Sequence, residues 1–92
     1  MPPLGFWFIR QRERVLTRLP RPPQSFLDGL ERFKVIEGRQ TWVDRKRQRF
    51  YQWDAFHGEV EVYNARGRHI GVMDTTGNFI KDAERGRKID VS

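Results

Sequence analysis

The hydrophobic pattern of the chain changes its period near residue 41, and this change limits the fold more than any other feature. After residue 40, apolar and polar residues alternate in short runs, which is typical of half-buried strands. Turn signals such as His57-Gly58 and Thr76-Gly77-Asn78 separate the runs. Because consecutive strands joined by short connections usually pair side by side, the pattern predicts an antiparallel meander. Its expected strands are residues 41–45, 49–54, 59–64, 68–74 and 78–81.

The part of the chain before residue 41 differs because it holds all five prolines, at positions 2, 3, 20, 22 and 23. Residues 6–19 are rich in helix formers and predict one short helix, and Ser25 can cap a second helix that runs through Phe33. We therefore expect residues 1–40 to form a helical and proline-rich segment and residues 41–92 the β-sheet core of one compact domain. The expected fold class is mainly β (α+β), with about five antiparallel strands after one or two short N-terminal helices.

The amino-acid composition limits the classes of partner that the chain can bind and excludes chemistry that needs cysteine. Eighteen Lys and Arg residues against twelve Asp and Glu give a formal charge of +6, which favours nucleic acid, an anionic membrane or an acidic protein as partner. No apolar run approaches the roughly 18 residues of a membrane span, and no secretory signal is recognisable, so we expect neither membrane insertion nor export. The lack of cysteine excludes disulfides, thiolate metal sites and a cysteine nucleophile.

One predicted strand concentrates the chemistry. In an extended strand alternate side chains share a face, so His57, Glu59, Glu61 and Tyr63 point one way and the intervening valines point into the core. RNA cleavage without a metal needs a base for the 2′-hydroxyl, an acid for the leaving 5′-oxygen and a cation for the phosphoryl charge. A carboxylate and a histidine supply the first two, and Arg85, Arg87 and Lys88 are candidates for the cation. The residue pattern alone also allows a second interpretation, in which this segment is an exposed strand that alternates Glu with Val and has no catalytic role.

A longer pattern runs over residues 42–90. It consists of Trp42-Val43-Asp44, the run from Tyr51-Gln52-Trp53-Asp54 to Tyr63, His69-Ile70-Gly71, Asp74, Thr76-Gly77-Asn78 and Arg87-Lys88-Ile89. In these residues the chain is similar to the cytotoxic domain of the ribosome-inactivating colicins and cloacin. The resemblance implies a strongly twisted antiparallel sheet and a toxin that cuts 16S rRNA in the decoding centre without a metal or cofactor, leaving a 2′,3′-cyclic phosphate.

The same resemblance implies a role for individual residues. Glu61 matches the general base of the family and His57 its proposed general acid. Asp54 matches the carboxylate that supports the histidine, and Arg87 matches the catalytic arginine. The choice of Arg87 over Arg85 depends on the Arg-x-Ile context. We expect Glu59, Tyr63 and Arg85 to support this site.

Basic residues beyond the motif predict an RNA-binding surface. Arginine and lysine would contact phosphates, and Tyr51 and Tyr63 could stack on a flipped base, although core packing is an equal alternative for Tyr51. We expect Trp42 and Trp53 in the core, and His69 in a structural or surface role. The predicted phosphate contacts are Arg45, Lys46, Arg47, Arg49, Arg66, Arg68 and Lys88.

Partners and rival functions follow from the same reasoning. A ribosome-directed nuclease endangers its producer, so we expect an acidic immunity or antitoxin protein and action in the bacterial cytoplasm. A toxin–antitoxin component and a domain trimmed from a secreted effector both stay open. The rival functions are a RelE-like toxin that cuts messenger RNA and a basic RNA- or ribosome-binding β-domain without enzymatic activity.

Overall fold

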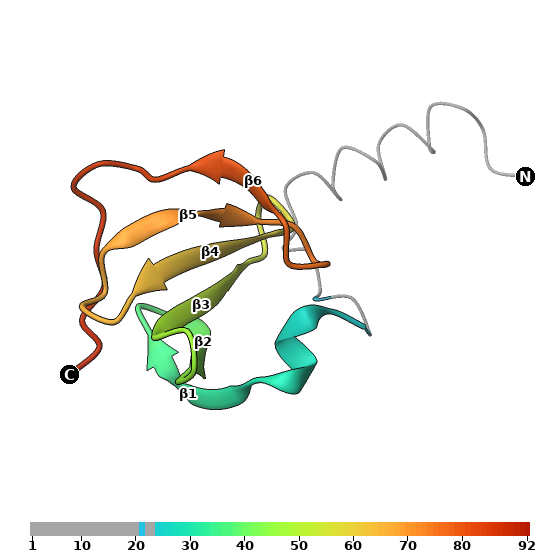
Figure 1. Ribbon diagram of the computed structural model, residues 1–92, viewed down its shortest axis with the longest axis horizontal. Coiled ribbons are helices and arrows are strands. Elements are labelled where there is room, and N and C mark those ends of the chain that lie inside the picture. Colours follow the sequence, from blue (N-terminus) through green and yellow to red (C-terminus); the bar gives the residue numbers. More distant parts are fainter. Residues whose placement is uncertain (1–20, 22–23) are drawn as a thin grey trace, which may run out of the picture.

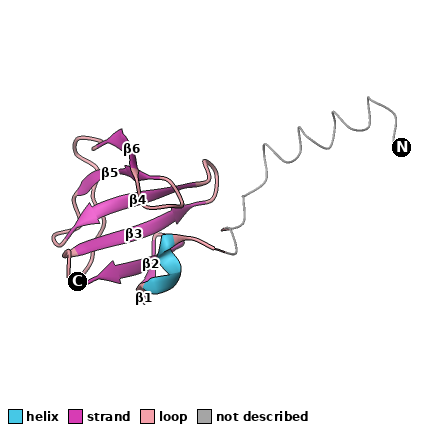
Figure 2. Ribbon diagram, turned by 45° about the vertical axis from the view of Figure 1, so that its right-hand side comes forward, coloured by secondary structure: helices cyan, strands magenta, loops and turns pink. Residues whose placement is uncertain are grey.

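The computed structural model describes residue 21 and residues 24–92, which form one six-stranded antiparallel sheet with strands in sequence order (Figure 1). This confirms the expected mainly β meander. The sheet twists between its β1 and β6 edges (Figure 2). Its elements are a 3-10 helix η1 (Phe26–Gly29) and strands β1 (Glu31–Ile36), β2 (Arg39–Asp44), β3 (Arg49–Asp54), β4 (Glu59–Asn64), β5 (His69–Met73) and β6 (Phe79–Asp82).

The region between residues 25 and 40 departs from expectation. Ser25 does begin a helix, and its backbone N–H donates to Asp28 at 3.0 Å, but the helix is a single 3-10 turn that ends at Gly29. The predicted helix through Phe33 is wrong, because β1 continues from Glu31 and pairs with β2. The boundary predicted between residues 40 and 41 therefore falls inside β2. The helix predicted for residues 6–19 lies outside the described residues.

The turn between β1 and β2 explains why the sheet can begin so early. Glu37 and Gly38 both have positive φ, 52° and 78°, which is the backbone of the two-residue turns that suit antiparallel hairpins. Gly38 adopts this conformation without a Cβ penalty. It therefore reverses the chain directly into β2.

Both faces of the sheet are covered, by different segments. On one face Trp42, Tyr51, Val60 and Val62 pack with Leu27 of η1. On the other face Ile36 and Tyr63 pack with Ile89, which belongs to the segment after β6. That C-terminal segment is tied to the sheet because Ile89 N–H donates to the Gly67 carbonyl at 2.8 Å and His69 N–H donates to the Arg87 carbonyl at 3.0 Å. No helix in the described part of the chain is long and apolar enough to cross a membrane.

Candidate active site

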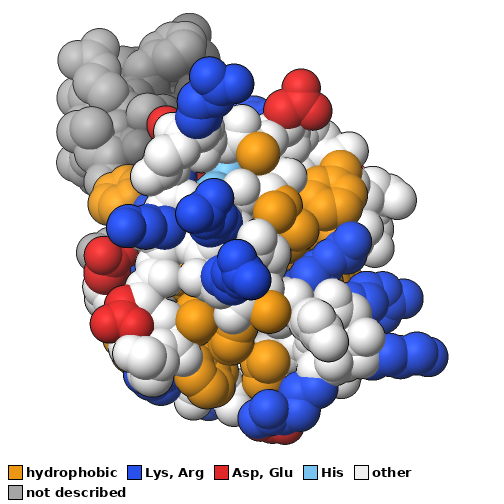
Figure 3. Space-filling view, turned by 60° about the vertical axis from the view of Figure 1, so that its left-hand side comes forward, with side chains coloured by type: hydrophobic (Ala, Val, Ile, Leu, Met, Phe, Trp, Pro, Cys, Tyr) orange, Lys and Arg blue, Asp and Glu red, His pale blue; other side chains and the backbone are white. Residues whose placement is uncertain are grey.

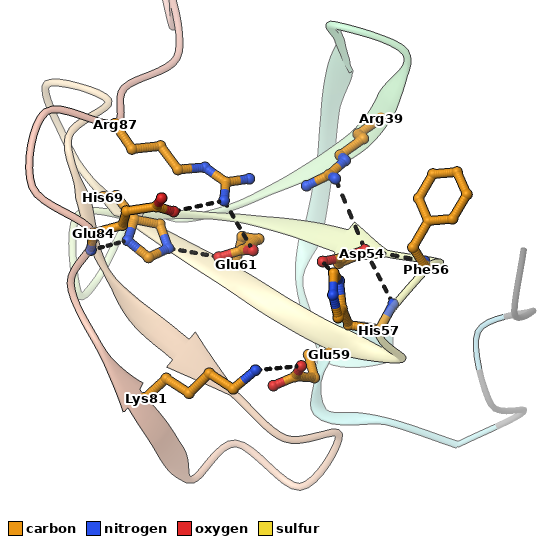
Figure 4. A network of polar contacts seen from close by, with 10 residues as sticks. All are labelled: Arg39, Asp54, Phe56, His57, Glu59, Glu61, His69, Lys81, Glu84 and Arg87. Carbon is orange, nitrogen blue, oxygen red and sulfur yellow. Dashed lines mark hydrogen bonds and ion pairs between the residues drawn. The ribbon is translucent and has the colours of Figure 1, made fainter. Parts of the chain in front are cut away.

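The four predicted catalytic residues meet in one pocket of about 290 Å³ on the face that the C-terminal segment crosses. Asp54 ends β3, His57 lies in the following turn, Glu61 is in the middle of β4, and Arg87 comes from the C-terminal segment (Figure 4). In the hairpin register Asp54 faces Glu59 and Gln52 faces Glu61, so the site occupies one face of the β3–β4 hairpin.

Asp54 holds His57 in a defined orientation. One carboxylate oxygen, Oδ1, accepts the backbone N–H groups of Phe56 at 3.0 Å and His57 at 3.3 Å, which fixes the turn. The other, Oδ2, lies 2.8 Å from His57 Nδ1. Because the carboxylate can only accept, Nδ1 carries the proton and donates, and Nε2 is left for other partners. The His57 side chain is 66% exposed, so Nε2 can reach a substrate.

The pKa of Asp54 lies below its ordinary value, so this carboxylate is ionised at neutral pH. Burial raises the pKa, but the hydrogen bonds from the His57 ring and from the backbone N–H groups of His57 and Phe56 outweigh burial. The charge of Arg39, whose Nη2 lies 3.8 Å from Asp54 Oδ1, acts in the same direction.

Glu61 is buried and lies between two donors. His69 Nε2 is 2.5 Å from Glu61 Oε2, and Arg87 Nη1 is 3.3 Å from Glu61 Oε1. His69 Nδ1 accepts the backbone N–H of Glu84 at 2.8 Å. A ring nitrogen that accepts carries no proton, so the proton of a neutral His69 is on Nε2 and points at Glu61. The structure thus assigns the tautomer of His69 and gives it a direct role at the site.

Arg87 lies in the pocket, as the resemblance implies, together with two further cationic side chains, Arg39 and Lys81. Burial lowers the pKa of Arg87, but the neighbouring Tyr63 and Glu61 and a hydrogen bond to Glu84 outweigh burial. The pKa of Arg87 therefore lies above its ordinary value, and the guanidinium stays charged. For the Tyr63 hydroxyl, which interacts with Arg87, burial has the opposite effect and raises the pKa. Arg85 does not line this pocket and lies in a neighbouring hollow with Arg68 and Lys88.

Glu59 contributes to the pocket through an ion pair with Lys81 of β6, in which Lys81 Nζ donates to Glu59 Oε1 at 2.9 Å. The second oxygen, Glu59 Oε2, is buried and has no hydrogen-bond partner within the described residues. This charge pair closes the side of the pocket opposite Arg39 and Arg87 (Figure 4).

Six of the residues that line the pocket lie outside the sequence prediction: Arg39, His69, Val72, Lys81, Asp82 and Glu84. His69 was expected to be structural or on the surface, but its side chain is 1% exposed and contacts Glu61. A signal for His69 does exist in the sequence, because pairing the two predicted strands around the turn at residues 65–67 brings it opposite Tyr63, on the face of Glu61. Arg39 and Lys81 belong to strands whose sequences show no such signal.

The predicted RNA-stacking tyrosines are both buried. Tyr51 is 2% exposed and packs edge-on against Phe26, and Tyr63 is 1% exposed beside His69. Neither ring face is accessible to a base in this fold, and of the two alternatives given for Tyr51 the structure has core packing. Tyr63 interacts with Arg87, and its supporting role stays a prediction.

The predicted phosphate-binding residues lie at the ends of the β2–β3 and β4–β5 hairpins and in the C-terminal segment. Two of them are already paired: Arg45 with Glu31 at 2.9 Å and Arg47 with Asp44 at 3.2 Å. Arg49 lies over the ring of Phe79, 5.4 Å from its centre. Lys46, Arg66, Arg68 and Lys88 are exposed. Figure 3 shows that basic side chains outnumber acidic ones on the face that it displays.

Among residue 21 and residues 24–92, no three His, Asp or Glu side chains are grouped so that they could hold a metal ion. What the pocket does offer is a buried carboxylate, an exposed imidazole backed by a second carboxylate, and a charged guanidinium. These groups can exchange protons and bind an anion.

The pocket, with its buried carboxylate, exposed imidazole and guanidinium on an antiparallel sheet, lies within the part of the chain that a known family covers. The sequence model of the family described as Cytotoxic matches residues 32–90, and the chain belongs to this family. The resemblance seen in the sequence is thereby confirmed.

The relatives that the chain resembles are bacteriocins of Escherichia coli. It is 42% identical to colicin E3 over 53 residues, which cover 55% of this chain and 10% of the colicin. It is 40% identical to cloacin and 40% identical to colicin-E6 over the same length, covering 9% and 10% of those proteins. The chain thus matches about a tenth of the length of these relatives.

Proposed function

We propose that this chain is a toxic endoribonuclease that cuts 16S rRNA in the decoding centre and thereby blocks translation. The observation that carries the proposal is the position of Glu61, which is buried between His69 and Arg87 in the pocket that His57 also lines. Membership of the Cytotoxic family and similarity to the colicins support a toxic nuclease as the broader activity.

In the proposed reaction Glu61 removes the proton of the ribose 2′-hydroxyl, and the 2′-oxygen attacks the adjacent phosphorus. The bond from phosphorus to the 5′-oxygen of the next nucleotide breaks, and that oxygen takes a proton from His57 Nε2. The products are a 2′,3′-cyclic phosphate and a 5′-hydroxyl. Asp54 accepts from His57 Nδ1 at 2.8 Å and so orients the ring whose Nε2 donates this proton.

Arg87 has the electrostatic role in this reaction. Its charge lies 3.3 Å from Glu61, beside the carboxylate that would receive the proton. The non-bridging phosphate oxygens gain negative charge in the transition state, and a pre-positioned guanidinium stabilises that charge. No step of the scheme uses a metal ion, because two side chains move the protons and a third supports the charge.

The proposed partners follow from the charge of +6 and from the relatives. We propose the ribosome as target in the bacterial cytoplasm and an acidic immunity or antitoxin protein as inhibitor. An acidic protein that covers the basic surface would lower its potential and block the approach of RNA.

The test is to incubate the purified chain with intact bacterial ribosomes in the presence of EDTA and to map breaks in 16S rRNA by primer extension. We expect one discrete cut near the 3′ end, which Glu61→Gln abolishes. Glu31→Gln is the matched control, because Glu31 is exposed and pairs with Arg45 outside the pocket. Intact 16S rRNA would contradict the proposal, and cleavage of translating messenger RNA instead would support the RelE-like alternative.

A further inference from the structure

A second and larger cavity, of about 490 Å³, lies next to the catalytic pocket. Its walls combine aromatic rings with guanidinium groups, and we call it the aromatic cleft, formed chiefly by Arg32, Arg39, Trp42, Trp53 and Phe56. Cavities of roughly 300–1,000 Å³ are of the size that binds small organic groups. The proposed reaction at Glu61 and His57 makes no use of this cleft.

The cleft and the catalytic pocket meet at one end of the sheet. Trp42 and Trp53 lie on the sheet face opposite Glu61, as the pairing of Trp42 with Tyr51 and of Trp53 with Val60 requires. Arg39 lines both cavities. A strand of RNA in the catalytic pocket can therefore place a neighbouring nucleotide around the end of the sheet and into the cleft.

Phe56 links the cleft to the catalytic turn. It immediately precedes His57, and its backbone N–H donates to Asp54 at 3.0 Å. Its side chain is 57% exposed, although a large apolar ring gains most from burial. Figure 4 shows the Phe56 ring and the Arg39 side chain on the same side of Asp54. The contact that fixes His57 thus also fixes an aromatic ring at the mouth of the cleft.

The charges around the cleft favour a nucleotide over an apolar group. Among the described residues that line it, Arg21, Arg32 and Arg39 stand against one carboxylate, that of Glu37. Arg21 also pairs with Asp28, and Arg39 lies 3.8 Å from Asp54, whereas Arg32 adds its charge to the cleft. Arg21 already lies over the Trp42 ring, 5.3 Å from its centre, which is the geometry of a cation on an aromatic face. One guanidinium nitrogen of Arg39, Nη1, is buried without a hydrogen-bond partner within the described residues, so Arg39 retains donor capacity.

We propose that the aromatic cleft binds one unpaired base of the RNA strand, close to the bond that is cut. The base stacks on Phe56, and Arg39 contacts the phosphate between this nucleotide and the catalytic pocket. Proteins that bind single-stranded RNA commonly stack splayed bases on aromatic and arginine side chains in this way. This inference rests on the proposed function, which it deepens by assigning a substrate subsite to residues outside the acid–base pair.

The test measures binding separately from cleavage. Glu61→Gln protein and a fluorescently labelled, unstructured RNA hexanucleotide are titrated by fluorescence anisotropy. Phe56→Ala in this background should weaken binding roughly 10- to 100-fold, the usual range for one base–aromatic stack. Phe56→Trp should keep the affinity, and Phe56→Leu should lose it although the apolar bulk stays. Ile80→Ala is the control, since Ile80 is an exposed apolar side chain on β6 outside the cleft.

A set of hexanucleotides, each with one base removed, shows whether the lost contact is to a base. At one position the loss of the base should weaken binding to the Phe56 protein and leave binding to Phe56→Ala unchanged. Equal binding by Phe56 and Phe56→Ala proteins, or equal effects at every position, would overturn the cleft as a base subsite. Failure of the proposed function is distinguishable, because it appears as uncut 16S rRNA with the unmutated chain.

Discussion

At the scale of single residues, the orientation of Glu61 depends on a histidine that is almost wholly buried. His69 receives a hydrogen bond from the Glu84 backbone on one ring nitrogen and offers the other to Glu61. We predict that His69→Phe lowers kcat about 100-fold and leaves KM nearly unchanged, because a small misplacement of a reacting group has an effect of this size. Single-turnover cleavage of ribosomes over a range of concentrations measures the two constants.

The matched variant for this prediction is His69→Gln, whose amide can still donate to Glu61. His69→Gln should recover part of the kcat that His69→Phe loses. If the role of His69 were purely structural, the two variants would differ in stability but would have the same kcat when compared at equal folded fraction. A KM that rises as much as kcat falls would contradict the positioning role.

Asp54 allows a prediction about pH and stability. Its pKa in the folded chain lies below the ordinary value of 3.8, so the ionised carboxylate stabilises the fold. This stabilisation is complete above pH 3.8 and is lost as the pH falls through the lowered pKa. Asp54→Asn should therefore reduce the free energy of unfolding by about 1–3 kcal/mol at pH 7, since Asp54 accepts three hydrogen bonds.

Urea unfolding of both proteins at pH values from 7 to 2.5 checks this prediction. The difference in free energy should stay constant from pH 7 to about pH 5 and shrink below the ordinary pKa. A difference that is independent of pH down to 2.5 would show that ionisation of Asp54 does not stabilise the fold.

The sequence predicts those site residues that one hairpin holds together. Asp54, His57 and Glu61 lie within eight positions on a strand and its turn, so alternation alone places two of them on one face. Arg87 required the family pattern, because it lies in a segment without regular structure. Arg39 begins β2, twenty-two positions before Glu61, and no local rule brings such distant positions together.

At the scale of elements, β1 shows why local pattern misleads at the edge of a sheet. Phe26, Leu30 and Phe33 recur at helical spacing, which favours a helix in isolation. In the fold Phe33 instead packs on Phe50, with ring centres 5.1 Å apart, and β1 gains backbone pairing with β2. The hairpin turn at residues 37–38 enforces this pairing, so tertiary contact overrides the weak helical preference.

The connection between β4 and β5 leads to a prediction about the C-terminal segment. Gly67 has φ of 82°, and a Cβ there would lie 2.1 Å from the carbonyl oxygen of Ile89. Gly67→Ala must therefore push away the segment that carries Arg87 and break the Ile89 bond to the sheet. We predict a loss of about 3 kcal/mol or more in the free energy of unfolding, from strain and lost packing together.

Gly38→Ala is the control for this effect. Gly38 has a similar φ of 78°, but a Cβ there meets nothing within 4 Å. Only the backbone strain of about 1 kcal/mol remains. Thermal and urea unfolding of the two variants separate the contributions, and equal losses would show that the C-terminal segment does not press on Gly67.

At the scale of the whole molecule, cationic side chains lie at the end of the sheet farthest from Asp54. The register pairs Arg49 with Asn64, so the β2–β3 and β4–β5 turns share that end, while Asp54 and Glu59 pair at the other. The six residues of β3 span roughly 20 Å. An RNA that contacts both ends of the sheet must therefore lie along its whole length.

This arrangement predicts how salt affects RNA binding. Each phosphate contact to a single strand contributes about −0.7 to the slope of log affinity against log salt concentration. Replacing Lys46, Arg66 and Arg68 by Gln should flatten that slope by about 2 in the Glu61→Gln background, measured by anisotropy with a 16S rRNA fragment between 50 and 200 mM salt. The control is Lys34→Gln, because Lys34 lies on β1 and donates to the carbonyl of Ser92. An unchanged slope in the triple variant would show that RNA contacts only the end of the sheet that holds Asp54. If Lys34→Gln flattened the slope by as much as each of the three replacements does, the effect would be one of net charge alone.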